Sequence, residues 1–167
     1  MMTEDITQTQ YLTFVLDSEE FALEIGKVRE VLEVTSITKV PQMPGFMCGV
    51  INLRGSVVPV IDMRMKFGLH QTEMTVNTCI IIVEILIGKE RTIIGAMVDS
   101  VKEVMEIEPS QIQPPPKIGT KLDTEFIKGM GKHNEGFLIL LDIDRVFSVD
   151  ELSMVSGLSG ADAEMVM

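Results

Sequence analysis

The stretch FALEIGKVREVLEV at Phe21–Val34 has a second copy in the chain, IGAMVDSVKEVMEI at Ile94–Ile107. The pattern V-[RK]-E-V-[LM]-E-[VI] is shared at seven consecutive positions, at an offset of 73 residues. At an offset of 80 residues, FMCGV from Phe46 onward matches FIKGM, and VVPVIDMRMKF from Val57 onward matches FLILLDIDRVF. Matches that follow one another in the same order indicate an internal duplication, so we expect two related halves.

Each half reads as five short strands, rich in β-branched residues and bounded by turn sequences such as DSEE, RG, IGKE and HNEG. The offset changes because the second half has a longer connection, which contains Pro114, Pro115 and Pro116. We expect strands at 11–16, 21–25, 28–34, 50–53 and 57–61, and again at 78–87, 91–98, 101–107, 127–130 and 137–141.

Five short strands with tight turns favour small barrels that close on themselves and limit exposed edges. The predicted fold class is therefore mainly β, with short helical segments. We expect residues 1–167 to form a single domain with one subdomain at about 10–67 and a second at about 78–150. The polar segment 68–77 is expected to link the two subdomains.

Short helical turns are predicted where two of the strands end. Asp62 and Asp142 are good N-cap residues for turns that run through Phe67 and Phe147. The tail after Ser148 has the pattern to hold a helix, and its last residues are expected to be flexible.

Composition narrows the class of function. With 46% hydrophobic and 23% charged residues, the chain is an ordered globular protein. A formal net charge of −11 argues against nucleic acid or an anionic membrane as the main partner. No apolar run reaches the roughly 20 residues of a membrane span, and the acidic N-terminus is unlike a signal peptide. Together with only two cysteines, this points to the cytosol and to no membrane insertion.

The usual catalytic and cofactor motifs are not found in the sequence. His70 and His133 are dispersed without metal-ligand spacing, and we interpret them as loop residues. Cys79 reads as a buried strand residue, whereas the role of Cys48 stays open. The carboxylates that cluster, Glu19 with Glu20 and Glu106 with Glu108, are expected to be solvated. We therefore predict no catalytic residue, cofactor or metal.

Thirteen methionines are present, a residue that fills irregular cores and also lines adaptable binding surfaces. Met97 and Met105 lie inside strand patterns, which favours the core. Met43 and Met47 flank Pro44-Gly45 in a predicted loop, where core and binding surface are both open alternatives.

The most specific polar motif is the turn Arg54-Gly55 between two apolar strands. Gly55 can supply the positive φ that the turn needs. The turn does not need the arginine, because the matching turn of the second half, Asn134-Glu135-Gly136, has none. Pro59 removes a backbone donor, so its strand is expected at a sheet edge or beside an irregularity.

The segment that contains this turn, GVINLRGSVVPVIDMR at Gly49–Arg64, resembles the signature of the CheW family, the coupling proteins of bacterial chemotaxis. The segments YLTFVLDSEEFALEIGKVREVLE, VPQMPGFMCGVINLRG, GAMVDSVKEVMEI and FLILLDIDRVF agree with it in the same order, from about Gln10 to Asp150. The resemblance implies two five-stranded SH3-like barrels packed around a shared hydrophobic core. It also implies a non-catalytic adapter that bridges chemoreceptors and the histidine kinase CheA.

The same resemblance implies a receptor-binding site at Val28, Glu30, Gly49 and Arg54, beside a groove between the barrels that accepts the tip of the receptor's helical hairpin. Cys48 stands where the family commonly has a basic residue, so a second cation is not expected there. The regulatory domain of CheA is expected on an apolar surface at a barrel end, with residues left unassigned. The protein would be cytoplasmic and recruited to membrane receptor arrays through its partners.

Other contexts remain open at this point. Similar modules occur inside CheA and, fused to a receiver domain, in CheV-type couplers; the short stretch after residue 150 favours a stand-alone coupler, of this or another chemosensory pathway. A small hydrolase that uses the clustered carboxylates or Cys48 is an alternative of a different class, and it requires a deep cleft with converging titratable groups.

Overall fold

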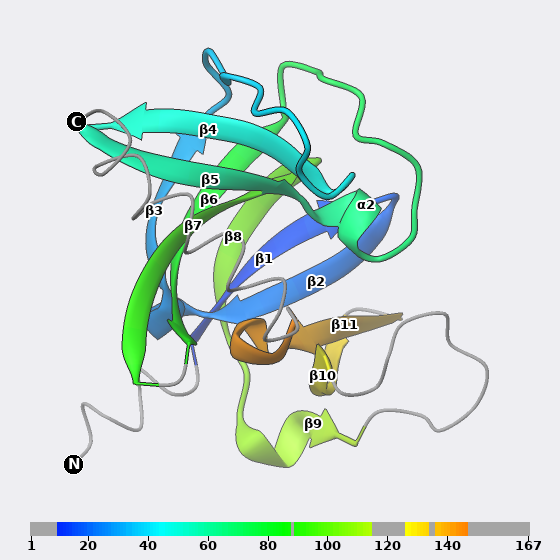
Figure 1. Cartoon of the computed structure of the whole chain (residues 1–167). Helices are drawn as coiled ribbons and strands as arrows, with labels where there is room; N and C mark the ends of the chain where they lie inside the picture. Colours follow the sequence, from blue (N-terminus) through cyan, green and yellow to red (C-terminus); the bar gives the residue numbers. More distant parts are fainter. Residues whose placement is uncertain (1–9, 88, 115–125, 134–135, 147–167) are drawn as a thin grey trace.

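The computed structural model of the chain describes residues 10–87, 89–114, 126–133 and 136–146. These residues form two β-sheets and a few short helical turns (Figure 1). The strands are β1 Gln10–Leu16, β2 Glu19–Glu24, β3 Val28–Glu33, β4 Met47–Leu53, β5 Ser56–Asp62, β6 Cys79–Ile87, β7 Glu90–Val98, β8 Ser100–Glu106, β9 Ile112–Gln113, β10 Ile127–His133 and β11 Gly136–Leu141. The helical elements are α2 Met63–Lys66 and the 3-10 turns η1 Ile25–Lys27, η2 Pro109–Gln111 and η4 Ile143–Arg145.

The two sheets repeat one pairing pattern. One sheet has the strand order β3-β6-β7-β5-β4, and the other has the order β8-β1-β2-β11-β10-β9. In each sheet a parallel pair joins two antiparallel parts, β5 with β7 in one and β2 with β11 in the other. The strands that occupy corresponding places, such as β3 and β8, are those that the sequence matches align. The repetition in sequence is therefore a repetition in strand pairing.

The expectation that each half closes a barrel of its own is wrong in one respect. The β1–β2 hairpin of the first half lies in the sheet of β8, β10 and β11, while the β6–β7 hairpin of the second half lies with β3, β4 and β5. The halves have thus exchanged their first hairpins, and the boundary at residues 67–78 does not separate the sheets. Sequence pattern fixes a strand locally, but the choice of partner depends on distant residues, which explains the error.

In each sheet, the segment that follows one edge strand pairs with the strand at the opposite edge and so closes the sheet into a barrel. Beyond β3, Thr38 exchanges two backbone hydrogen bonds with Val50 of β4, at 2.8 and 2.9 Å. Beyond β8, the two-residue strand β9 pairs with β10 in the equivalent place. These closures support the barrel description, because each brings the chain from one edge strand of a sheet to the strand at its opposite edge. The short β9 was not predicted.

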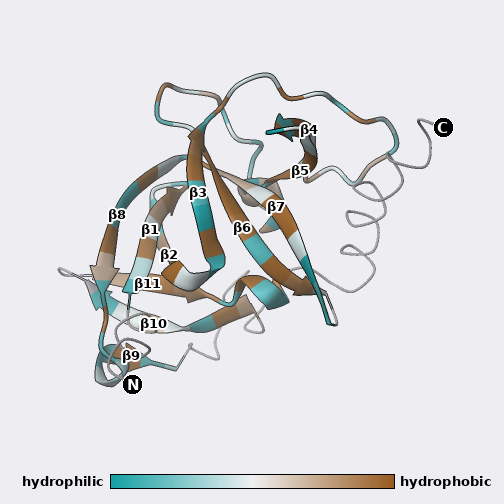
Figure 2. Ribbon diagram, turned by 90° about the vertical axis from the view of Figure 1, so that its left-hand side faces the viewer, coloured by the Kyte–Doolittle hydropathy of each residue, from teal (hydrophilic) through white to brown (hydrophobic). Residues whose placement is uncertain are grey.

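The hydrophobic clusters are arranged as expected for two barrels that pack against each other around a shared core. The largest cluster draws on both sheets and includes Phe14, Phe21 and Ile81, with Phe14 and Phe21 stacked at 5.8 Å between ring centroids. Two smaller clusters each belong to one sheet, one around Ile82 and the other around Leu140. Hydrophobic residues therefore face both the inside of each barrel and the space between the barrels. Figure 2 shows hydrophobic residues along the strands of both sheets.

The predicted strands all occur, with ends that differ by at most three residues. Pro59 is not at an edge, since β5 lies between β4 and β7. The parallel ladder with β7 begins only at Val60, so the missing donor of Pro59 interrupts no pair on that side. The predicted helix after Ser148 lies outside the described residues.

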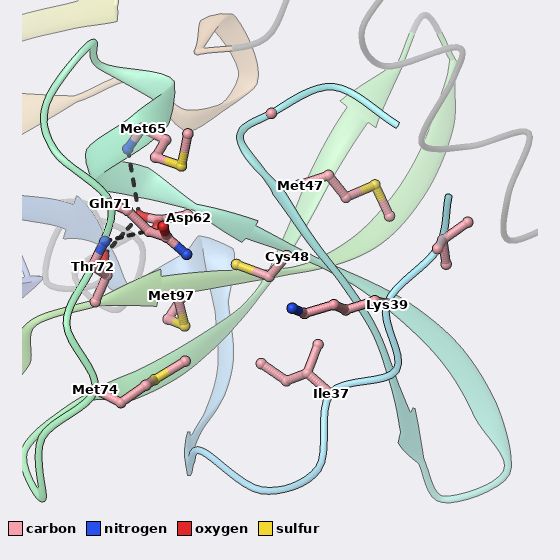
Figure 3. Close-up of a pocket in the computed structure, with 12 residues that line it drawn as sticks. Ile37, Lys39, Met47, Cys48, Asp62, Met65, Gln71, Thr72, Met74 and Met97 are labelled. Atoms are coloured by element: carbon pink, nitrogen blue, oxygen red, sulfur yellow. Dashed lines mark hydrogen bonds between the residues drawn. The ribbon is translucent and has the colours of Figure 1, made fainter. Parts of the chain in front are cut away.

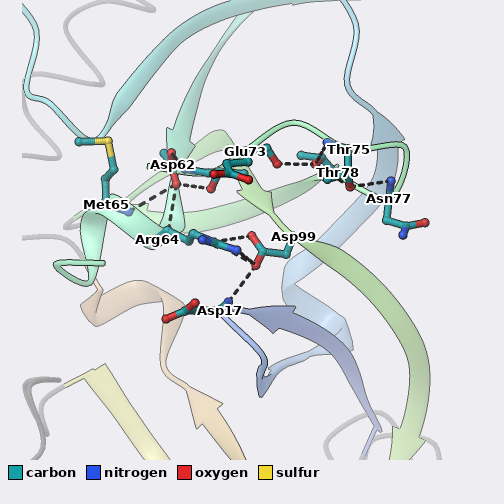
Figure 4. A network of polar contacts seen from close by, with 10 residues as sticks. Asp17, Asp62, Arg64, Met65, Glu73, Thr75, Asn77, Thr78 and Asp99 are labelled. Atoms are coloured by element: carbon teal, nitrogen blue, oxygen red, sulfur yellow. Dashed lines mark hydrogen bonds and ion pairs between the residues drawn. The ribbon is translucent and has the colours of Figure 1, made fainter. Parts of the chain in front are cut away.

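Asp62 fixes the junction between β5, α2 and the segment that links the halves (Figure 4). Its buried carboxylate accepts hydrogen bonds from the backbone N–H of Arg64 at 3.0 Å and of Met65 at 3.4 Å, which confirms the predicted N-cap. It also accepts from the backbone N–H of Thr72 at 3.0 Å and from its Oγ1 at 2.7 Å. One carboxylate thus holds both the helix and the link.

Replacing Asp62 with alanine is expected to lower the free energy of unfolding by about 2 kcal/mol, because a cap and two further charged hydrogen bonds are lost. Asp142 is the internal control: it precedes η4 but makes no capping hydrogen bond. The variant Asp142→Ala is expected to stay within about 0.5 kcal/mol of the unmodified protein. Urea unfolding followed by circular dichroism measures both, and equal losses would show that Asp62 has no special role.

Candidate functional site

Two of the four residues predicted to bind a partner are in direct contact. Arg54 lies in the turn between β4 and β5, and its Nη1 and Nη2 donate to the two carboxylate oxygens of Glu30 at 2.7 and 2.9 Å. Glu30 belongs to β3, at the opposite edge of the same sheet. The ion pair therefore spans the closed side of the barrel. It lies at the surface, with 71% of the arginine side chain and 28% of the glutamate side chain exposed.

The backbone of Arg54 is in the left-handed region, with φ of 51°, and Gly55 follows with φ of 88°. Two positive φ values between the paired residues Leu53 and Ser56 are typical of a type I′ hairpin turn. The sequence indicated the positive φ of Gly55 but not that of Arg54. Asn-Gly is the usual choice for such a turn, because an arginine pays a steric cost in this conformation.

Each partner of the pair stabilises the charge of the other. The hydrogen bonds from the Arg54 guanidinium hold the pKa of the Glu30 carboxyl below its usual value. The same contacts raise the pKa of Arg54. Both groups are therefore charged around neutral pH, and the pair presents a fixed arrangement of guanidinium and carboxylate to solvent.

Val28 begins β3 and lies half-buried against the core that the two sheets share. Along this strand half-buried and exposed side chains alternate, with Val28 and Glu30 among the less exposed ones. Val31, on the other set, is 40% exposed. The strand thus combines an ion pair with accessible aliphatic surface.

Charged side chains from the exchanged hairpin flank the same strand. Arg29 of β3 donates to Glu84 of β6, and Arg91 of β7 lies 3.4 Å from the second carboxylate oxygen of Glu84. The hydrogen bond from Arg29 holds the pKa of Glu84 below its usual value. Sequence reasoning did not bring these residues to β3, because it assigned β6 and β7 to the other barrel.

Gly49 lies in the same β4–β5 hairpin as Arg54, but it does not contribute to the surface of the site. It is buried, has φ of 145°, and lies where a Cβ atom would be 2.1 Å from the carbonyl oxygen of Thr38. It forms part of an irregularity in β4, at the place where the barrel closes. Its role in partner binding stays a prediction, and its geometry gives it a structural role in the closure.

The residues considered for catalysis are held in ways that do not favour it. Burial, with a smaller effect from Asp62, raises the pKa of the Cys48 thiol to about 12, so it is protonated at neutral pH. Cys79 donates to the carbonyl oxygen of Asn77 at 3.2 Å. Glu20 is paired with Lys102 at 2.8 Å. His70 is exposed in the link between the halves, and the side chain of His133 lies outside what the structure describes.

Within the described ranges, no group of three His, Cys, Asp or Glu side chains converges as metal ligands would. In the same ranges, no helix combines the length and apolar character of a membrane span.

The sequence model of the CheW-like domain matches residues 10–151. The chain is 34% identical over 150 residues to the chemotaxis protein CheW of Klebsiella aerogenes, covering 90% of this chain and 88% of the relative. It is 33% identical over 147 residues to the chemotaxis protein CheW of Bacillus subtilis, covering 87% and 91%. The crystal structure of the scaffolding protein TtCheW from Thermoanaerobacter tengcongensis superposes with a TM-score of 0.76 at 38% identity, covering 86% of this chain and 90% of that one.

These relatives carry the names of chemotaxis and scaffolding proteins, not of enzymes, in agreement with the expectation of a non-catalytic protein. The match extends over both sheets, including the exchanged hairpins and the turn with Arg54. The chain belongs to the CheW-like domain family.

Proposed function

We propose that the chain is a chemotaxis adapter that couples the cytoplasmic tip of chemoreceptors to the regulatory domain of the histidine kinase CheA. It would act in the cytoplasm and join membrane receptor arrays through these partners, without contacting nucleic acid or entering the bilayer. Its membership of the CheW-like domain family supports this role, as do the names of its relatives.

The proposed receptor site rests on one observation: Arg54 has a left-handed backbone conformation, which is unfavourable for a residue other than glycine. A non-glycine residue in the left-handed region costs roughly 1–2 kcal/mol. An exposed ion pair such as that of Arg54 with Glu30 adds little net stability, because solvent screens the attraction between the charges. Residues that break a local rule without an equal gain in stability are expected at functional sites. We therefore assign Arg54 and Glu30 to receptor contact.

The mechanism would be a transfer of binding free energy between two surfaces. A receptor helix lays apolar side chains beside Val28, and the fixed pair of Arg54 and Glu30 sets its register through charge and hydrogen bonds. A second surface holds the kinase, and a change in receptor state alters the free energy of that contact. In this scheme the adapter neither makes nor breaks a covalent bond.

Arg54→Asn is expected to separate binding from stability. Asparagine suits a type I′ turn, so the free energy of unfolding should stay unchanged or rise by up to about 1 kcal/mol. Affinity for a receptor cytoplasmic fragment should fall by about 1–3 kcal/mol, the range for disturbing an interfacial charge contact. Calorimetric titration and urea unfolding measure the two quantities on the same preparation.

The matched control is Arg145→Gln, which removes an arginine that is 72% exposed and paired with Asp142 at 3.5 Å, in the other sheet's terminal turn. It should leave receptor affinity unchanged. The double variant Glu30→Arg with Arg54→Glu exchanges the two charges and keeps an ion pair between β3 and the turn. If its receptor affinity equalled that of the unmodified protein, the ion pair would matter for binding but not which residue carries which charge. Unchanged affinity of Arg54→Asn would remove Arg54 from the site.

The coupling itself is tested by co-sedimentation with receptor fragments and CheA, singly and together. The adapter should recruit CheA to the receptor fragments, and the Arg54→Asn variant should lose this recruitment while still binding CheA. Binding to only one of the two partners would contradict the proposed role.

A further inference from the structure

Four methionines from four different parts of the chain line one open pocket of about 310 Å³ (Figure 3). They are Met47 in β4, Met65 in α2, Met74 in the link between the halves, and Met97 in β7. The volume lies at the lower end of the roughly 300–1,000 Å³ usual for ligand sites. The pocket is therefore large enough to take one large apolar side chain.

The pocket is separate from the pair of Arg54 and Glu30. Met47 and Asp62 lie at one end of the β4–β5 hairpin, and Arg54 lies in the turn at the other end. A strand of seven residues spans roughly 20 Å, so the two sites do not overlap. A change in one can be made without touching the other.

The walls are apolar and adaptable. Met97 is buried at 2% exposure and forms part of the barrel core, whereas Met74 is 56% exposed at the rim. Ile37 and Val40 add half-buried aliphatic surface from the segment that follows β3. Flexible thioether side chains can fit guests of different shape, which is why methionine is frequent on adaptable binding surfaces.

The polar groups give the pocket a direction. The Asp62 carboxylate is already engaged by four hydrogen bonds, and Cys48 is an uncharged thiol at neutral pH. Lys39 is exposed, and its side chain points toward the other residues that line the pocket (Figure 3). Within the part of the chain that the structure describes, Lys39 makes no ion pair. The cation therefore stands at the mouth, above apolar walls.

We propose that this pocket binds a peptide segment of a partner protein, taking one large apolar side chain among the methionines and an adjacent carboxylate against Lys39. A guest in the reverse orientation would bring its carboxylate toward Asp62, which repels it. The overall charge of −11 opposes acidic partners in general, so the attraction is confined to the surroundings of Lys39.

Methyl NMR of protein labelled with ¹³C at the methionine ε-carbons tests the pocket directly. The probes are the capped dipeptides Ac-Glu-Leu-NH2, Ac-Gln-Leu-NH2, Ac-Lys-Leu-NH2 and Ac-Glu-Gly-NH2. With Ac-Glu-Leu-NH2, the methyl signals of Met47, Met65, Met74 and Met97 should shift at about millimolar concentration, while those of Met105 and Met130 in the other sheet should not. The glycine probe should cause no shift, because it lacks the apolar group.

The acidic probe should bind about three- to fivefold more tightly than the glutamine probe, the effect expected of one exposed charge pair. Lys39→Gln should abolish this preference, and Lys132→Gln, which removes an exposed lysine of β10, should preserve it. Both variants should retain the receptor affinity of the unmodified protein, so this proposal can fail without the adapter role failing.

Several results would overturn the proposal. They are equal binding of the glycine probe, preference for the lysine probe, shifts spread over all methionines, and no shift at about 10 mM. Octanoate, which combines an apolar chain with a carboxylate but has no peptide group, should bind more weakly than Ac-Glu-Leu-NH2. Tighter binding of octanoate would identify the pocket as a site for a small amphipathic acid and would overturn the assignment to a peptide.

Discussion

When the chain is divided between Met74 and Thr75, we expect fragments 1–74 and 75–167 each to be unfolded alone and to fold together when mixed. Fragment 1–74 keeps the β1–β2 and β4–β5 hairpins and the bridge between Thr38 and Val50, but it loses the partner of β3 and the parallel pairs of β2 and β5. Isolated hairpins are marginally stable at best in water. The shared core, which draws on both fragments, is lost as well.

Amide NMR spectra of the separate and mixed fragments measure this effect. The cut leaves Asp62 and Thr72 in one fragment, so their hydrogen bonds are not the cause of any loss. Dispersed signals should appear only on mixing, at equal amounts of the two fragments. A monomeric, dispersed spectrum from either fragment alone would contradict the exchange of hairpins and restore the simpler arrangement of one barrel for each half.

Gly49→Ala is expected to lower the free energy of unfolding by about 3 kcal/mol or more. The new Cβ atom would lie 2.1 Å from the Thr38 carbonyl oxygen, in a backbone conformation with φ of 145° that L-residues rarely adopt. Relief of the clash moves Thr38 away from β4 and breaks its two hydrogen bonds with Val50, which close the barrel. Backbone strain, overpacking and lost hydrogen bonds therefore add in one variant.

Gly55→Ala provides the control for backbone strain alone. Its φ is also positive, at 88°, but nothing lies within 4 Å of the position of a Cβ atom. A loss of only about 1 kcal/mol is expected. Urea unfolding of both variants gives the comparison. If Gly49→Ala were as stable as Gly55→Ala yet failed to bind receptor, Gly49 would contribute to binding directly, and the structural explanation would be wrong.

The second half repeats this requirement. Gly129, which matches Gly49 at the offset of 80 residues, lies where a Cβ atom would be 2.5 Å from Ile112 and 3.0 Å from the carbonyl oxygen of Gln113. Those two residues form β9, the closure of the second barrel. The glycine repeated in FMCGV and FIKGM therefore has one physical cause in both places, the approach of a closing segment to the sheet edge.

The strands and the mainly β fold could be predicted because their signals are local. Alternation, β-branched residues and turn sequences set the strands, and the N-cap preference of Asp62 set the start of α2. The membership of the two sheets could not be predicted, since β2 finds its parallel partner β11 more than a hundred residues later. The two-residue β9 carries too little pattern to be recognised.

The residues of the candidate site come from the sequence and stay a prediction, whereas their geometry could not be predicted from it. Arg54 was singled out because the hairpin does not need it, yet its contact with Glu30 depends on the closure of the barrel across β3 and β4. Its left-handed backbone was also missed, because a sequence shows only the glycine that follows. The methionine pocket forms from four distant segments, so methionine content alone could not locate it.

The exchange of hairpins has a consequence for synthesis on the ribosome. The hairpin of residues 10–24 is the first to emerge, but its neighbours in the sheet are completed only when residue 141 has been made. Because the ribosome adds about 5–20 residues per second, the apolar side chains of Leu12, Phe14 and Phe21 stay without their neighbours in the core for roughly 6–23 seconds. The nascent chain therefore exposes these apolar side chains early, and we expect it to bind chaperones that act at the ribosomal exit.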